Sequence, residues 1–288
     1  MSRKVLPRTN DLLAFMLERH RIYLRKESGE MQKPWTRDPV LQRYRFCNVY
    51  RELDTVTIWI RKNIREPYYD HPRLWFMLAM ARQINLPETL QEIMDGNAWP
   101  VAGYNPERVR KIMLARQARG EKLYTGAYML NAHGTKPTDP KDKAFFTTEY
   151  VLGELWRQRA RMPEVLTKRS LAEVAGFLTK FHGWAGFTSA QAVADIKYTS
   201  QLKDAKDWWT WAAPGPGSIR GLNVVMGRAL DTRLKPEAWL AEVNDLRSRV
   251  LEKWPFGPLH AQDMQNCLCE FSKYVRGWSR SKYDGLPT

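Results

Sequence analysis

Cysteine is scarce in this sequence of 288 residues, which contains three. Cys267 and Cys269 are separated by one residue, too close for an ordinary disulfide, and Cys47 is remote from both in the chain. No Cys/His spacing typical of a zinc site occurs. These absences exclude a disulfide-stabilised scaffold, and they favour reduced thiols, a cytoplasmic setting and no bound metal.

Long apolar runs are absent as well. No stretch of 18 apolar residues occurs, so we expect neither a membrane span nor a membrane partner. The first seven residues lack the apolar core of a signal peptide. The chain also lacks the Gly-x-x-x-x-Gly-Lys-Ser/Thr pattern of a Walker A loop, which excludes that type of nucleotide site.

Basic residues, by contrast, are in excess. The chain has 46 Lys and Arg against 31 Asp and Glu, a formal net charge of +15. Because Lys and Arg that neutralise phosphates supply most non-specific nucleic-acid affinity, this charge favours a DNA partner over an inert basic surface. Twelve Trp and twelve Tyr residues suit base stacking, although we expect most of the Trp residues in the core.

Helical periodicity runs through most of the chain. The Ser170–Glu173 capping box and Pro236 in a first turn mark two helix starts, and Asp70 is expected to cap a third helix. Strand-like alternation is limited to one weak candidate within residues 121–129. The sequence therefore predicts an all-α fold.

Two polar segments interrupt the helical pattern. Residues 131–143 contain one Gly and two Pro, and residues 212–221 contain three Gly and two Pro. No internal repeat is visible. We expect a single helical domain over residues 1–288, with a division into two helical lobes near 131–143 as the alternative.

A helix, a short turn with two glycines and a second helix are expected over residues 178–196. This is the layout of a helix-hairpin-helix, in which Gly183, Gly186 and Thr188 would bring backbone N–H groups to a DNA phosphate. In helix-hairpin-helix DNA glycosylases a catalytic Asp follows the hairpin, and Asp207 lies 24 residues after Gly183. This turn has one more residue between its glycines than the usual pattern, and a helix cap is the alternative role for Asp207.

A glycine-rich loop follows directly. Gly215, Gly217 and Ser218 offer backbone N–H groups and a hydroxyl, and Arg220 offers a cation, so the loop suits a phosphate cradle. Trp208 and the Asp before it place a pocket floor and a carboxylate within fifteen residues of the loop. A tight structural turn is the alternative.

Residues 45–55 are the next segment with chemical potential. On a helix, Arg51 and Asp54 would pair at i,i+3, and Asn48 would share a face with other polar residues. The pattern alone favours a solvated helix. Residues 261–274 predict an amphipathic helix with a polar face and nothing more.

Three motifs, taken in order, resemble those of one phage enzyme family. They are Phe46-x-Asn48-x-Tyr50-Arg51-Glu52-x-Asp54, Ala212-Ala213-Pro214-Gly215-Pro216-Gly217-Ser218-x-Arg220-Gly221-Leu222 and Leu268-Cys269-Glu270-Phe271-x-Lys273-Tyr274. Over roughly residues 40–276 the chain resembles the α-glutamyl/putrescinyl-thymine pyrophosphorylases, or amino acid:DNA transferases. The helical domain of phage 5-hydroxymethyluracil DNA kinases looks related. A kinase needs a P-loop, which this sequence lacks, so the transferase is preferred.

The resemblance implies a DNA-modifying domain that acts on double-stranded phage DNA carrying modified pyrimidines. The amine of a free amino acid would displace pyrophosphate from the 5-methylene carbon of a thymine-derived base. That chemistry requires a flipped base, donors for the pyrophosphate and a general base. The setting would be the host cytoplasm, with no cofactor; the amino acid, the sequence context, the oligomeric state and any Mg²⁺ requirement stay open.

The resemblance and the side-chain chemistry together suggest roles for particular residues. Asp207 is the candidate base and Arg220 neutralises the leaving pyrophosphate. Arg51 and Asn48 would hold the amino acid carboxylate or the pyrimidine edge. The substrate-binding candidates are Asn48, Arg51, Asp54, Trp208, Gly215, Gly217 and Ser218. Cys47 is disfavoured as a nucleophile because nothing near it in the sequence lowers its pKa.

Two other functions fit the sequence. A helix-hairpin-helix DNA glycosylase is supported by the hairpin and Asp207, and it would leave abasic sites. A non-catalytic helical DNA-binding partner of a base kinase would bind DNA without turnover.

Overall fold

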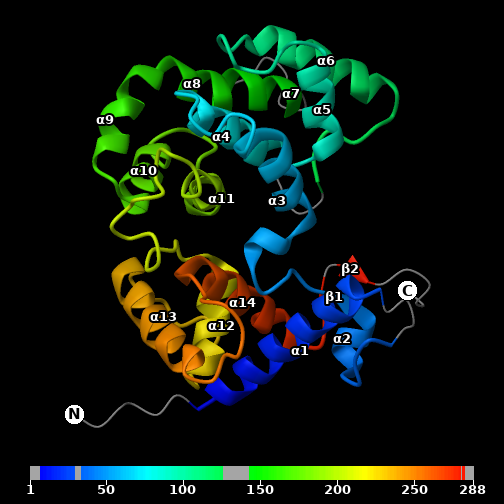
Figure 1. The fold of residues 1–288 in the computed structure, drawn as a ribbon, viewed down its shortest axis with the longest axis vertical. Helices are drawn as coiled ribbons and strands as arrows, with labels where there is room; N and C mark the ends of the chain where they lie inside the picture. The colour runs from blue at the N-terminus through cyan, green and yellow to red at the C-terminus, as the bar shows by residue number, and fades with distance from the viewer. Residues whose placement is uncertain (1–6, 30–33, 126–142, 280, 283–288) are drawn as a thin grey trace. The chain divides into compact units, whose positions relative to one another are not determined.

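The computed structural model describes residues 7–29, 34–125, 143–279 and 281–282. The described part is mostly helical, and its strands are two segments of two residues each, so the predicted all-α fold is confirmed (Figure 1). The chain forms two compact units. The first comprises Met1–Asp54 and Trp209–Thr288, and the second, Thr55–Trp208, is inserted between these two parts of the sequence.

The first unit is built around α14, which packs against α1, α12 and α13 (Figure 1). Its apolar core includes Phe15 of α1, Leu222 of α12, Trp239 of α13 and Phe271 of α14, all nearly inaccessible to solvent. Its elements are α1 (Thr9–Glu27), α2 (Pro39–Arg43), β1 (Tyr44–Arg45), η1 (Arg51–Leu53), α12 (Pro216–Val225), α13 (Pro236–Leu251), α14 (Ala261–Tyr274) and β2 (Ser281–Lys282). The antiparallel pair β1–β2 has Tyr44 opposite Lys282 and Arg45 opposite Ser281.

The second unit is organised around α4, whose eleven residues are all buried and which packs against α11. A helix that is buried on every side requires neighbours on every side, and the surrounding elements supply them, including polar partners for Arg82 and Gln83. The elements are α3 (Thr55–Ile60), η2 (Arg61–Arg65), α4 (Leu74–Ile84), α5 (Pro87–Asp95), α6 (Pro106–Ala118), α7 (Lys143–Phe145), η3 (Phe146–Leu152), α8 (Gly153–Arg157), η4 (Arg159–Arg161), α9 (Met162–Thr167), α10 (Leu171–Leu178) and α11 (Gly186–Ile196).

Two predicted helix starts are confirmed and one is wrong. Ser170 caps α10 through its hydroxyl, which accepts the Glu173 N–H at 3.3 Å, and Pro236 is the first residue of α13. Asp70 does not cap α4, which begins at Leu74. Pro72 explains the delay, because a proline disfavours helical angles at the residue before it.

The weak strand candidate within residues 121–129 is described only in part. Residues 121–125 have no strand structure, and 127–129 lie outside the described residues. The predicted lobe division near 131–143 falls mostly on residues 126–142, which also lie outside them. The helices on either side of that segment, α6 and α7, contact each other within the second unit, so the chain divides instead after Asp54 and after Trp208. In the described ranges, no helix is both long enough and apolar enough to cross a membrane.

Candidate functional site

The three motif segments meet on α14 in the first unit. The backbone N–H of Arg51 donates to the Oδ1 of Asp263 at 3.1 Å, and the side-chain amide of Asn266 donates to the Asn48 carbonyl at 3.1 Å. Helix α12 packs along the same helix. The first motif segment is more than 150 residues from the other two in the sequence, and the fold brings it together with them.

Residues 46–50 are not helical, contrary to the helix considered for residues 45–55. Asn48 donates its backbone N–H to Asp54 Oδ1 at 2.9 Å and its side-chain amide to the Leu53 carbonyl at 2.7 Å. Asn and Asp side chains compete for backbone groups in this way, and here they close a short loop around η1. The expected Arg51–Asp54 ion pair does not form within the described residues.

Arg51 nevertheless has the features of an anion-binding residue. Its Nε and Nη2 atoms are buried and donate no hydrogen bond to any described residue. Buried guanidinium nitrogens in native proteins are normally paired, so their partner is expected to be a ligand or water.

The glycines of the second motif allow two helices to cross closely. A Cβ on Gly221 would overlap the carbonyl oxygen of Leu268, and one on Gly217 would overlap the Cys269 sulfur. The Ser218 hydroxyl is buried and exchanges hydrogen bonds of 3.0 Å with the backbone of Gly215, the N-cap of α12. The glycine-rich segment therefore forms the start of α12, packed on α14, and the phosphate cradle stays a prediction.

Arg220 occupies a different environment from these glycines. It lies on α12 and is exposed, and it has no ion pair with a described residue. The structure thus leaves its side chain available for an anion in solution.

Charged side chains of both signs surround Cys47. Limited access of water, followed by the carboxylates of Glu270 and Asp54, raises the pKa of its thiol, while Arg19 and Lys273 oppose this rise. The residue still reaches the surface. The raised pKa keeps the thiol in its protonated form near neutral pH, and a protonated thiol is a weak nucleophile.

The N-terminus of α14 contributes residues that the sequence analysis did not single out. His260 Nδ1 lies 3.0 Å from Asp263 Oδ2, and the His260 ring lies against Trp209 with 4.5 Å between ring centroids. Asp263 is buried and also accepts the His260 backbone N–H at 2.9 Å. The only sequence signal for this cluster was the polar face of the helix, which says nothing of its partners.

Asp207 and Trp208 belong to the second unit, whereas the glycine-rich loop belongs to the first. The Asp207 carboxylate accepts hydrogen bonds from the backbone N–H groups of Leu171 and Ala172 at 2.7 and 3.0 Å, and from the Ser170 hydroxyl at 2.9 Å. This is the helix-cap alternative. Trp208 donates its indole N–H to the carbonyl of Lys197 at 2.8 Å, so both residues have structural partners within their unit.

Two helices, α10 and α11, flank the turn at Gly183, as expected for residues 178–196, and the helix-hairpin-helix stays a prediction. Gly183 has a positive φ of 78°, and a Cβ there would lie 2.5 Å from Val151. Gly186, the first residue of α11, is exposed and has open space around it, and Thr188 is half-buried in the same turn. Gly183 therefore serves packing, and the candidate DNA-contacting end of the hairpin is the start of α11.

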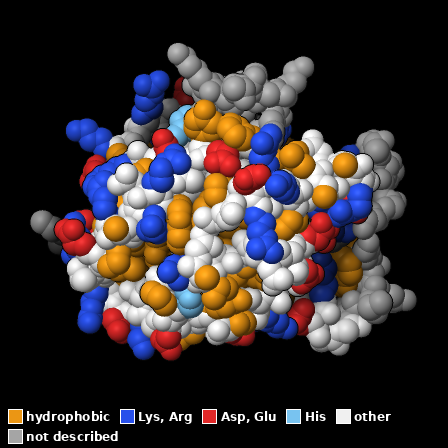
Figure 2. Space-filling view, turned by 90° about the horizontal axis from the view of Figure 1, so that it is seen from above, with side chains coloured by type: hydrophobic (Ala, Val, Ile, Leu, Met, Phe, Trp, Pro, Cys, Tyr) orange, Lys and Arg blue, Asp and Glu red, His pale blue; other side chains and the backbone are white. Residues whose placement is uncertain are grey.

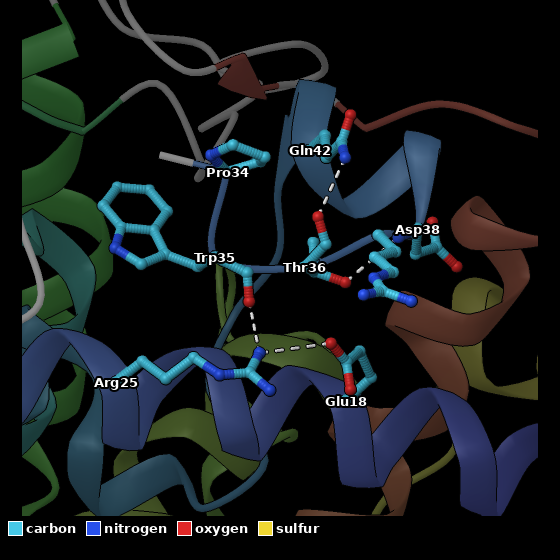
Figure 3. A pocket seen from close by; sticks show the side chains of 8 residues that line it. Glu18, Arg25, Pro34, Trp35, Thr36, Asp38 and Gln42 are labelled. Atoms are coloured by element: carbon cyan, nitrogen blue, oxygen red, sulfur yellow. Dashed lines mark hydrogen bonds and ion pairs between the residues drawn. The ribbon is translucent and has the colours of Figure 1, made fainter. Parts of the chain in front are cut away.

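An open groove of about 610 Å³ lies beside α1 (Figure 3). Arg25 of α1 donates to Glu18 at 3.3 Å and to the Trp35 carbonyl, while Gln42 donates to the Thr36 carbonyl at 2.8 Å. The full lining is Glu18, Arg25, Pro34, Trp35, Thr36, Arg37, Asp38 and Gln42. None of these is a predicted site residue, and much of their hydrogen bonding is internal to the groove.

The basic side chains do not single out a site on the face shown in Figure 2. Lys and Arg are spread across that face, with acidic and hydrophobic side chains between them. The charge of +15 therefore supports a nucleic-acid partner without locating its binding surface there.

Comparison with known proteins gives two matches. A family model described as 5-hmdU DNA kinase, helical domain, matches residues 7–283. A 5-hmdU DNA kinase of Bacillus phage SP10 is 26% identical over 227 residues, which are 73% of this chain and 35% of that kinase. The chain thus spans about a third of the length of this curated relative. No solved structure matches.

Proposed function

Since the chain belongs to the family of the 5-hmdU DNA kinase helical domain, we propose that it acts in the hypermodification of thymine-derived bases in phage DNA. The specific reaction is the transfer of an amino acid through its amine to the 5-methylene carbon of a pyrophosphorylated 5-hydroxymethyluracil. The C–N bond forms as the C–O bond to pyrophosphate breaks. The amine loses a proton, and both bonding electrons of the C–O bond leave with pyrophosphate.

The carrying observation is the meeting of all three motif segments on α14. Arg51, with two buried and unpartnered nitrogens, lies in this site and suits a carboxylate or phosphoryl oxygen. Arg220, exposed on α12 of the same unit, suits the charge that develops on the leaving pyrophosphate. Asn48 and Asp54 shape the loop that carries Arg51.

The general base is assigned differently from the sequence expectation. Asp207 caps α10, so its carboxylate is committed to three hydrogen bonds. The His260–Asp263 pair lies in the first unit with Arg51 and Arg220, and a carboxylate that binds Nδ1 orients the ring so that Nε2 can accept a proton. We therefore favour His260 as the base.

The transfer is tested with DNA that carries pyrophosphorylated 5-hydroxymethyluracil. The protein is incubated with this DNA and all common amino acids, and the nucleosides are then weighed by mass spectrometry. A nucleoside heavier than that of 5-hydroxymethyluracil by one amino acid residue supports the proposal. The variants His260→Asn and Arg51→Gln should lower the yield of this nucleoside. Abasic sites without an adduct would identify the glycosylase alternative, and unchanged nucleosides would exclude both.

A second candidate is a non-catalytic helical DNA-binding partner of a base kinase. One observation favours it: the relative with 26% identity is a kinase, and the matched region is only 35% of its length. This candidate predicts DNA binding with no new nucleoside in the same assay.

A further inference from the structure

Arg19 of α1 is buried in the first unit, with 5% of its surface exposed. One nitrogen, Nη2, donates to the carbonyl of Cys47, and the guanidinium lies 4.8 Å from the centroid of the Phe15 ring. Its Nε and Nη1 atoms are buried and have no hydrogen-bond partner among the described residues. The fork of donors is thus only partly used by the protein.

The charge of Arg19 has no counter-ion in direct contact within the described ranges. Its neighbour on α14 is the Cys267 thiol, whose pKa is raised to about 12 by burial even though Arg19 opposes the rise. That thiol is therefore neutral at physiological pH. A buried cation that lacks both an anion and a full set of acceptors is costly unless a ligand completes it.

Two carboxylates also lie near enough to Cys47 to influence its thiol. Asp54 and Glu270 act on the same thiol as Arg19 does, and Lys273 binds Glu270 at 2.5 Å. Because Cys47 reaches the surface, this group of charges borders solvent. A buried guanidinium and carboxylates that share the surroundings of one thiol complement a small molecule that carries an anion and a cation close together.

We propose that Arg19 binds the α-carboxylate of a free amino acid, whose ammonium group lies toward Asp54 and Glu270. This inference rests on the proposed function and names the site of its second substrate. The planar guanidinium is suited to bidentate carboxylate binding. The backbone N–H of Arg51 binds Asp263, one turn of α14 before Cys267. The Arg51 side chain adds a second cation to the same loop.

Binding is measured without DNA, so the test is independent of transfer. Each common amino acid is first screened against the full chain by saturation-transfer NMR, and the best binder is then measured by calorimetry. Its decarboxylated amine is the matched ligand control. Arg19→Lys keeps the charge but loses the fork, and Arg21→Gln, an exposed arginine on the same helix, is the matched protein control.

The proposal expects the decarboxylated amine to bind about tenfold or more weakly than the amino acid. Arg19→Lys should lose a similar factor for the amino acid but not for the amine, while Arg21→Gln changes neither. Thermal unfolding of both variants checks that they remain folded. The proposal would be overturned if no amino acid binds, if the amine binds with equal affinity, or if Arg19→Lys binds the amino acid as tightly as the wild type does. Amino acid binding with no transfer to DNA would refute the proposed function alone.

Discussion

Asp207 makes three hydrogen bonds at the start of α10, and these define what its substitution should do. Asp207→Ala should lower the stability of the second unit by about 1–2 kcal/mol, the usual cost of a lost helix cap. Asp204→Ala, an exposed acidic neighbour, is the control and should change stability little. Chemical denaturation measures both. If Asp207→Ala instead left stability unchanged and abolished transfer, with activity returning at high pH, Asp207 would be the base.

Arg220 is an exposed cation on α12, and we propose that it stabilises the charge that develops on the leaving pyrophosphate. Charge that builds in the transition state makes a cation more valuable there than in the ground state. Arg220→Ala should therefore lower the turnover number by about a hundredfold, with no recovery at high pH. Arg233→Ala removes another exposed arginine of the same unit and should be nearly silent. Normal turnover by Arg220→Ala would return α12 to a purely structural role.

Tyr274 should make the first unit sensitive to alkaline pH. Burial, followed by its hydrogen bond to Asp38 at 2.5 Å, raises the pKa of Tyr274 to about 12, against an ordinary value of 10.0. The folded state holds this proton more tightly than the unfolded state does, so the contribution to stability is complete below pH 10 and is lost as the pH rises to about 12. The thermal unfolding temperature of the wild type should fall more steeply over this pH range than that of Tyr274→Phe. Parallel curves of unfolding temperature against pH would show that Tyr274 plays no part in the loss of stability at alkaline pH.

At the scale of elements, the crossing of α12 and α14 depends on missing side chains. Gly221→Ala should cost about 1–3 kcal/mol, because its Cβ meets the fixed backbone of Leu268. Gly176→Ala is the matched control: it lies on α10, is exposed and has open space around it. That change should stabilise the protein by about 0.5–1 kcal/mol through the better helix propensity of alanine. Equal changes in stability for Gly221→Ala and Gly176→Ala would mean that α12 and α14 move apart at little cost to accept the added Cβ.

Local signals predicted several of these elements correctly, since a cap or a first-turn proline acts within one helical turn. Ser170 and Pro236 are examples, and the residues of α14 were also recognised as a helix. The helix considered for residues 45–55 does not form over its first half. The Asp54 carboxylate accepts the Asn48 backbone N–H, and the Asn48 side-chain amide donates to the Leu53 carbonyl. A periodic apolar pattern cannot reveal this competition.

The site was only partly predictable for a related reason. Asn48, Arg51 and Arg220 were selected by residue type and motif, but the partner of Arg51 is Asp263, 212 residues away. Arg19 and His260 stand outside the three motifs, and their roles depend on burial and on neighbours from other elements. Conversely, Asp207 was singled out by spacing, and its hydrogen bonds favour a cap.

For the whole molecule, the net charge of +15 predicts DNA binding that depends strongly on salt. A protein that neutralises several phosphates releases counterions, so its affinity for duplex DNA should fall at least about tenfold between 50 and 200 mM salt. Fluorescence anisotropy with a labelled duplex measures this. A flat response would show that the charge is not used for DNA. Gly186→Glu, at the open start of α11, should weaken binding without the packing damage expected at Gly183.

The division of the first unit between both parts of the sequence has a consequence during synthesis. The loop that carries Arg51 leaves the ribosome 212 residues before Asp263, to which it binds, and Asn266 follows within the same helix. The inserted second unit can fold in the meantime, whereas the first unit is complete only after α14 has emerged. A nascent chain that ends before α14 therefore leaves the loop that carries Arg51 without the partners that hold it in place.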